Sequence, residues 1–294
     1  MACWIVRSPL PSESARYLGG AALVALAFIA LYFFFVASHA GQSADQLAYD
    51  GAQFGHRSVT PFTRGLLDSV PSVAVVLAFL VTGLIAVLRR NWRTLVVALG
   101  VAAAAVLSAQ LLKHGLLDRP DLGVSGYAGN SFPSGHTTVA AASALVVFLV
   151  ASPRLRPILA VAGTAFAVLA GAATLANQWH RPSDVIASLL VVAFWGCVGG
   201  AVLAWPRSGA GTRAPVNVQT TRLALPRAST FTRLLRVSLV PFAAVAGIAL
   251  AATFVFEFRE SVDLFVAYVG GVTAIVTAGL TLALTGIRLF SRLP

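Results

Sequence analysis

Long apolar blocks alternate with short polar segments along this chain. Of its 294 residues, 58% are hydrophobic and 11% are charged, whereas a soluble domain usually carries about 25% charged residues. A run of about 20 apolar residues spans a bilayer, and an isolated segment satisfies its backbone in lipid only as a helix. The pattern therefore predicts an all-α, polytopic membrane helix bundle. The blocks are at approximately residues 18–37, 66–88, 94–112, 135–151, 157–176, 184–204, 237–256 and 263–287.

The first block admits a second interpretation, as a secretory signal. Arg7 and Arg16 precede it, and residues 38–40 (Ser-His-Ala) resemble a cleavage site. Because the block is long for the apolar core of a signal peptide, a membrane anchor is the favoured interpretation.

The formal charge of +11 does not indicate a nucleic-acid partner, because the basic residues lie mainly between apolar blocks. Loops rich in Arg and Lys usually face the cytoplasm. Arginine-rich segments follow the second, fourth, sixth and eighth blocks, which places all four segments on one side by parity. We therefore expect that side, and the N-terminus, to be cytoplasmic. These segments contain Arg89, Arg90, Arg93, Arg154, Arg156, Arg207, Arg213, Arg222, Arg227, Arg233, Arg236, Arg288 and Arg292.

The clearest linker is segment 206–236, which is rich in Gly, Pro, Thr and Arg. Six predicted helices precede it and two follow it. The sequence thus predicts a six-helix core at 1–205, a basic cytoplasmic linker at 206–236 and a C-terminal two-helix membrane segment at 237–294.

A second polar segment, residues 39–65, is expected on the outer side. It contains Asp45, Asp50, His56 and Arg57. The sequence leaves open whether this segment lies on the membrane surface or covers a site.

Three polar groups interrupt the apolar pattern, and loop parity puts all three on the outer side. The first is Lys113 with Arg119-Pro120, the second is 130–136, and the third is 179–184. Ionisable groups at membrane depth are costly and usually mark function. The pattern therefore permits one shared site.

Several of these residues suit the binding of phosphate. Lys113 and Arg119 are cations, and Arg can hold a phosphate through two parallel hydrogen bonds. Ser134 and Gly135 precede an apolar helix, whose free N–H groups and dipole favour an anion. Ser134 adds a hydroxyl donor, and Gly135 lets the backbone approach the ligand closely.

The remaining residues suit acid and nucleophilic chemistry. His180 and Asp184 are four residues apart, which places both side chains on one face of a helix start. A carboxylate there fixes the imidazole tautomer and leaves the other ring nitrogen free to attack. His136 can donate a proton to a leaving oxygen.

Taken singly, each residue has a simpler explanation, such as a cap, an interfacial anchor or a charge that complements the helix dipole. Those explanations weaken when all the residues must be explained together.

These residues resemble the motifs of the type 2 phosphatidic acid phosphatase superfamily. Residues 132–136 (Phe-Pro-Ser-Gly-His) are similar to its central motif, and Lys113 with Arg119-Pro120 is similar to its first motif. His180 and Asp184 resemble the H-x-x-x-D end of its third motif. The resemblance covers about residues 18–204.

The resemblance implies a metal-independent phosphoesterase that needs no cofactor and works through a phosphohistidine intermediate. By the resemblance, His180 is the nucleophile, Asp184 orients it, and His136 is the general acid. The implied phosphate ligands are Lys113, Arg119, Ser134 and the Gly135 amide.

The sequence departs from the family pattern at two places. Five residues separate Lys113 from Arg119, where the family usually has six. Ala173 and Thr174 stand where the third motif usually has Ser-Arg, so one phosphate-binding cation is missing. Our hypothesis is that Arg181 replaces it in space.

The leading interpretation is a multi-pass enzyme of the cytoplasmic (plasma) membrane that acts at the extracytoplasmic face. It would hydrolyse a lipid phosphate or a polyprenyl phosphate or diphosphate, and its partner would be that phosphorylated lipid within the membrane. One alternative is a transferase that passes a phosphoryl or phospho-alcohol group to an alcohol. Another is a non-catalytic protein that binds or transports a phosphorylated lipid.

Overall fold

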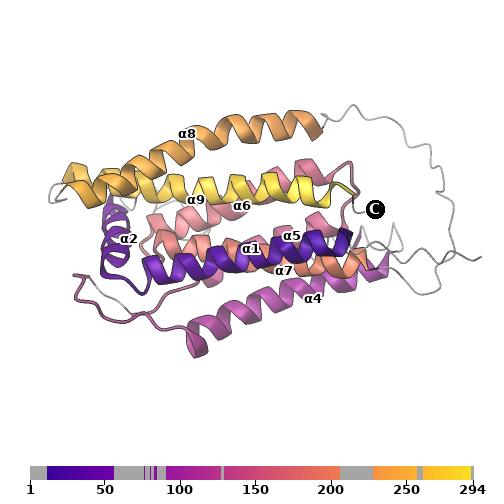
Figure 1. Ribbon diagram of the computed structural model, residues 1–294, viewed down its shortest axis with the longest axis horizontal. Helices are drawn as coiled ribbons and strands as arrows, with labels where there is room; N and C mark the ends of the chain where they lie inside the picture. The colour runs from indigo at the N-terminus through magenta and orange to yellow at the C-terminus, as the bar shows by residue number, and fades with distance from the viewer. Residues whose placement is uncertain are drawn as a thin grey trace, which may run out of the picture.

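Helices make up all the regular structure in the described part of the chain. The computed structural model describes residues 12–55, 76, 80, 83–84, 91–126, 129–205, 228–256 and 261–292, and it has no strand within these ranges. This confirms the predicted all-α bundle (Figure 1). The main helices are α1 (Ser12–Phe35), α2 (His39–Gly51), α4 (Trp92–Leu111), α5 (Gly135–Val150), α6 (Arg156–Ala176), α7 (Pro182–Ala204), α8 (Ala228–Val255) and α9 (Ser261–Leu289).

The helices fit a bilayer by length and composition. Among the described residues, six helices are long and apolar enough to cross a membrane, and α5 is a shorter apolar helix of 16 residues. The chain is therefore a multi-pass membrane protein. Seven predicted blocks coincide with described helices, while block 66–88 falls outside the described residues except at 76, 80, 83 and 84.

Helix α8 begins at Ala228, inside the segment predicted to be a linker. Near this end of the helix Leu235 packs in the core, while Arg233 and Arg236 are exposed. Long basic side chains at a helix end can keep their charge in the polar region while the helix continues into the membrane. The rest of the predicted linker, 206–227, lies outside the described residues.

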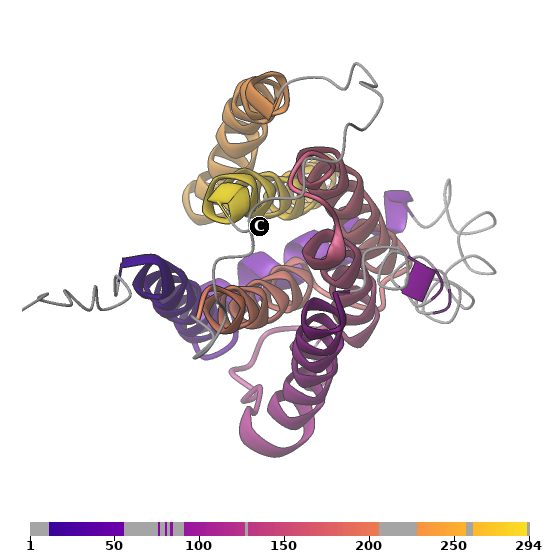
Figure 2. The same cartoon turned by 90° about the vertical axis from the view of Figure 1, so that its right-hand side faces the viewer.

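Helix α7 is central to the bundle, since it packs against α1, α4, α5 and α9 (Figure 2). Small residues allow these contacts: a Cβ at Gly20 would lie 3.2 Å from Cys197 Sγ, and one at Gly199 would lie 3.2 Å from Val101. Membrane helices associate through such close packing because lipid supplies no hydrophobic drive between them. Helix α9 packs against α2, α6 and α7 as well as α8, so the last pair contacts the elements that carry the polar motifs.

The two ends of the bundle differ in chemistry. The polar motifs lie where α4 and α6 end and α5 and α7 begin, as loop parity predicted. At the opposite end Arg93 Nη2 donates to the Val202 carbonyl at 2.6 Å, and Arg156 Nη1 donates to the Phe290 carbonyl at 3.2 Å. The cytoplasmic assignment of this basic end remains a prediction.

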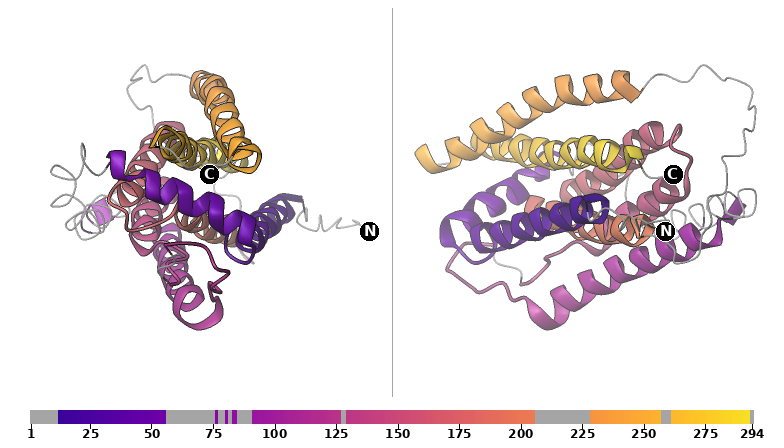
Figure 3. Two further views of the ribbon diagram at one scale, coloured as in Figure 1. Left: turned by 90° about the vertical axis from the view of Figure 1, so that its left-hand side faces the viewer. Right: turned by 45° about the vertical axis from the view of Figure 1, so that its right-hand side comes forward.

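Helix α2 lies across the motif end of the bundle (Figure 3, left). Ser38 caps it by accepting the Gly41 N–H at 3.1 Å. A side chain at Gly41 would collide with the Phe34 carbonyl, and one at Gly51 with the Leu264 carbonyl, so these glycines let α2 lie tightly on α1 and α9. Residues 39–51 therefore form a helix that covers the motif end.

Candidate active site

The starts of α5 and α7 are bonded to each other. Ser134 caps α5, where its hydroxyl accepts the Thr137 N–H at 3.3 Å, and its own N–H donates to the Asp184 carbonyl at 3.0 Å. Ser188 Oγ donates to the Ser134 carbonyl at 2.7 Å. This fixes the first turn of α5, with His136, beside the first turn of α7, with Asp184.

Asp184 is the fully buried acceptor at the centre of the site. His180 Nδ1 lies 3.4 Å from Asp184 Oδ2, the i, i+4 pairing expected from the sequence. The same oxygen accepts the Arg181 N–H at 3.0 Å and Ser131 Oγ at 2.6 Å. A carboxylate beside Nδ1 favours the tautomer that carries its proton on Nδ1, which directs the ring lone pair to Nε2.

His136 faces the same cluster from α5. Its ring centroid lies 6.3 Å from that of His180 and 5.3 Å from that of Trp179. The structure therefore brings the second and third motifs together, although the two histidines are 44 positions apart in the sequence.

Arg119 also enters the cluster, despite its shortened spacing from Lys113. The chain between them completes a π-helical turn, Leu112–Leu116, before turning back. Arg119 Nη2 lies 3.3 Å from Asp45 Oδ2 and 3.5 Å from Asp184 Oδ1, with its side chain almost fully buried. The guanidinium thus bridges two carboxylates, and its role in phosphate binding remains a prediction.

Arg181 is held by three side chains. Its Nε donates to Gln46 Oε1 at 2.9 Å, its Nη1 donates to Ser131 Oγ at 3.2 Å, and its guanidinium carbon lies 5.3 Å from the centre of the Tyr49 ring. Ser131 in turn donates to Asp184, so two successive hydrogen bonds link the Arg181 guanidinium to the carboxylate beside His180. This placement fits the hypothesis that Arg181 replaces the missing cation.

Thr174 occupies the position of that missing cation in the third motif. It is fully buried, and its hydroxyl donates to the Gly171 carbonyl at 2.7 Å. Its own carbonyl accepts the Trp179 N–H at 2.9 Å. Thr174 therefore supports the turn that leads to His180.

Lys113 and Gly135 lie at the same end of the bundle. The Lys113 carbonyl accepts Asn130 Nδ2 at 3.0 Å, which ties the first motif to the second. Within the described ranges, Lys113 makes no ion pair. A Cβ at Gly135 would meet Gln110 Nε2 at 3.4 Å, which is ordinary contact. The phosphate contacts of Lys113 and of the Gly135 amide remain predictions.

Helix α2 supplies residues to which the sequence assigned no role. Asp45 accepts the Ser183 N–H at 3.0 Å and Ser183 Oγ at 2.5 Å, which satisfies a free donor in the first turn of α7. Gln46 and Tyr49 hold Arg181 as described above. A clue was present in the sequence, since Gln42, Asp45, Gln46 and Tyr49 follow helical spacing, but only the fold shows that this polar face is turned inward.

No metal site is evident in the described part of the chain, where no three His, Cys, Asp or Glu side chains gather closely enough to hold an ion. The chemistry available is that of an imidazole oriented by a carboxylate, a second imidazole opposite it, and two buried guanidinium groups.

The environment of Asp45 changes its titration. Burial raises the pKa of its carboxyl from 3.8 to about 6, which outweighs the lowering by Arg119, and Asp184 adds to the rise. Hydrogen bonds from Ser183 act in the opposite direction. Ionised Asp45 is therefore less favourable in the folded protein than in the unfolded chain.

The Asp45→Asn variant should reveal this cost. A carboxyl whose pKa is raised on folding contributes stability that is fully present below pH 3.8 and is lost as the pH rises through about 6. The melting temperature of the wild type should therefore fall, relative to Asp45→Asn, between about pH 4 and pH 7. Thermal unfolding in one detergent across this range measures it, with the exposed Asp118→Asn as the control. A wild-type to Asp45→Asn difference that does not change with pH would contradict the prediction.

Comparison with known proteins gives one match. Residues 108–207 match the model of the PAP2 superfamily, and this region contains all eight residues predicted for the site. No curated protein and no solved structure matches the chain. The resemblance predicted from the three motifs is thus confirmed: residues 108–207 of this membrane protein match the PAP2 superfamily, whose members are phosphatases.

Proposed function

We propose that this chain is a membrane phosphatase that hydrolyses a lipid phosphate, or a polyprenyl phosphate or diphosphate, through a phosphohistidine intermediate. The observation that carries the proposal is the buried contact of 3.4 Å between His180 Nδ1 and Asp184 Oδ2, with His136 facing the His180 ring. An imidazole backed by a carboxylate is an activated nucleophile, and a second imidazole can serve as the acid.

The first step forms the bond between His180 Nε2 and phosphorus and breaks the bond from phosphorus to the ester oxygen. His136 donates a proton to that oxygen, and the alcohol leaves. Asp184 stabilises the positive charge on the phosphorylated imidazole. Cations and backbone donors stabilise the negative charge that develops on the phosphoryl oxygens. Such electrostatic stabilisation is usually the largest contribution to this kind of catalysis. The proposed donors are Lys113, Arg119, Arg181, Ser134 and the Gly135 amide.

The second step regenerates the enzyme. Water attacks phosphorus, the bond to His180 Nε2 breaks, and His136 accepts the proton that the water loses. Inorganic phosphate then leaves. With an alcohol in place of water, the same step would transfer the phosphoryl group, so products formed with an added acceptor lipid distinguish the phosphatase from a transferase.

Two features support a lipid substrate. The candidate residues lie at the ends of membrane-spanning helices, which is the depth of lipid head groups. Basic residues collect at the opposite end, and under the positive-inside rule this supports a site on the extracytoplasmic face. A non-catalytic binder is less well supported, because a binder would not need an imidazole oriented by a carboxylate.

A phosphate-release screen with the purified protein tests the proposal. The wild type should release phosphate from at least one member of a panel of phosphatidic acid, phosphatidylglycerol phosphate and polyprenyl phosphates. His180→Ala should reduce release to the background rate, because it removes the attacking nitrogen. His39→Ala, at an exposed histidine outside the site, should retain wild-type activity. Unchanged turnover in His180→Ala would refute the mechanism.

The role of Arg181 is tested by comparison with another arginine. Arg181→Ala should lower kcat/KM about tenfold or more, the effect of losing a hydrogen bond between charged groups. Arg154→Ala, exposed at the opposite end, should leave kcat/KM unchanged. Steady-state kinetics on the substrate from the screen measures both, and full activity in both variants would exclude Arg181 from phosphate binding.

A further inference from the structure

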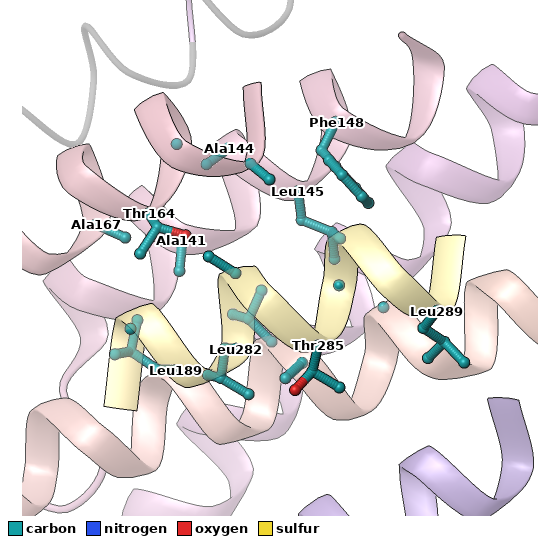
Figure 4. A pocket seen from close by; sticks show the side chains of 18 of the residues that line it. Ala141, Ala144, Leu145, Phe148, Thr164, Ala167, Leu189, Leu282, Thr285 and Leu289 are labelled. Atoms are coloured by element: carbon teal, nitrogen blue, oxygen red, sulfur yellow. The ribbon is translucent and has the colours of Figure 1, made fainter. Parts of the chain in front are cut away.

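An apolar cavity of about 190 Å³ lies inside the bundle, away from the candidate active site. Five helices contribute to its wall: α1, α5, α6, α7 and α9. Figure 4 shows alanine and leucine side chains around most of the space, with Thr164 and Thr285 among the few polar ones. An apolar cavity of roughly 150 Å³ stays dry and takes up apolar ligands, so this larger one suits hydrocarbon.

The cavity opens sideways between α1 and α9. Leu23 of α1, at its wall, is 68% exposed, and Thr285 of α9 is also exposed. The two helices meet at the basic end, where Tyr17 Oη donates to the Leu289 carbonyl at 3.2 Å and the Tyr17 and Phe290 rings are 5.0 Å apart. The space is therefore a cleft that is closed at the basic end and open to lipid at its side.

Polar packing separates this cleft from the candidate active site. Ala141 and Leu189 line the cleft five residues beyond His136 and Asp184, a rise of about 7–8 Å along each helix. Thr138 and Ser188 are buried between them, and each donates its hydroxyl to the Ser134 carbonyl at 2.7 Å. The cleft continues from there to the basic end, so it faces the leaflet opposite the active site.

Two exposed arginines flank the closed end of the cleft. Arg16 precedes Tyr17, and Arg288 precedes Leu289, so each adjoins a member of the bonded pair. Gly20 and Thr285 line the cleft. Arg16 lies four residues before Gly20, and Arg288 lies three residues after Thr285, so each arginine is on the same helix face as a lining residue. Two guanidinium groups at head-group depth beside an apolar cleft complement a phosphate with an attached hydrocarbon chain.

We propose that the cleft between α1 and α9 binds an anionic phospholipid of the leaflet opposite the active site. One hydrocarbon chain fills the cavity, and Arg16 and Arg288 hold the phosphate. The bound lipid bridges α1 and α9, and so stabilises the folded bundle. This binding is independent of the proposed phosphatase activity.

Thermal unfolding in nanodiscs tests this proposal without reference to activity. The melting temperature of the wild type should rise by about 2–4 °C when phosphatidylglycerol is added to phosphatidylcholine. Two variants should lose most of this rise: Gly286→Leu, which fills the cleft, and the double variant Arg16→Gln with Arg288→Gln. A Cβ at Gly286 meets nothing within 4 Å, so Gly286→Leu should fold.

Matched variants control for bulk and for surface charge. Gly19→Leu adds the same side chain on α1 but outside the cleft, again with nothing within 4 Å of the new Cβ. Arg233→Gln with Arg236→Gln removes two exposed arginines from the same end of the bundle. Both controls should keep the wild-type rise.

Four outcomes would overturn the proposal. The wild type could show no rise with phosphatidylglycerol, or Gly286→Leu could keep the full rise. Equal loss in the Arg233 and Arg236 control would indicate a general charge effect.

Native mass spectrometry should also find one retained phosphatidylglycerol per wild-type chain and none in Gly286→Leu. If Gly286→Leu instead retained as much lipid as the wild type but differed from it in oligomeric state, the cleft would be assigned to a second copy of the chain.

Discussion

The buried carboxylate of Asp184 is the interaction on which the candidate site depends. Removing an ionised carboxylate from water costs several kcal/mol unless donors surround it. Here the donors come from the turn before α7, from the loop before α5 and from Arg119, so a single charge draws three motifs together. The same carboxylate lies 3.4 Å from His180 Nδ1, and in the proposed mechanism this contact leaves the other ring nitrogen free to attack.

The frame around this site extends beyond the region that matches the PAP2 superfamily. Asp45, Gln46 and Tyr49 belong to α2, which precedes the matched residues 108–207. Helix α2 in turn rests on α9, which follows them, with Gly271 of α9 next to Pro182 of α7. The two buried arginines are thus oriented by a helix from outside the matched region, and α9 helps to hold that helix in place.

Much of this arrangement could be predicted from the sequence. Apolar length predicted the helices, loop parity put the three motifs at one end, and the i, i+4 spacing paired His180 with Asp184. The role of α2 could not be predicted in this way, because its 13 residues are too few and too polar to give a membrane signal. Its contacts are also distant in sequence, since Asp45 bonds Ser183 across 138 residues. The bridging of Arg119 between two carboxylates likewise requires knowing where α2 lies.

Trapping the phosphorylated protein tests the central claim most directly. Purified protein turning over a substrate labelled in its phosphate would be quenched with base, under which phosphohistidine survives, and the labelled peptide would be sequenced by mass spectrometry. The proposed mechanism predicts label on His180, and none in His180→Ala. Label on a different residue, or sustained phosphate release with no label on His180, would contradict it.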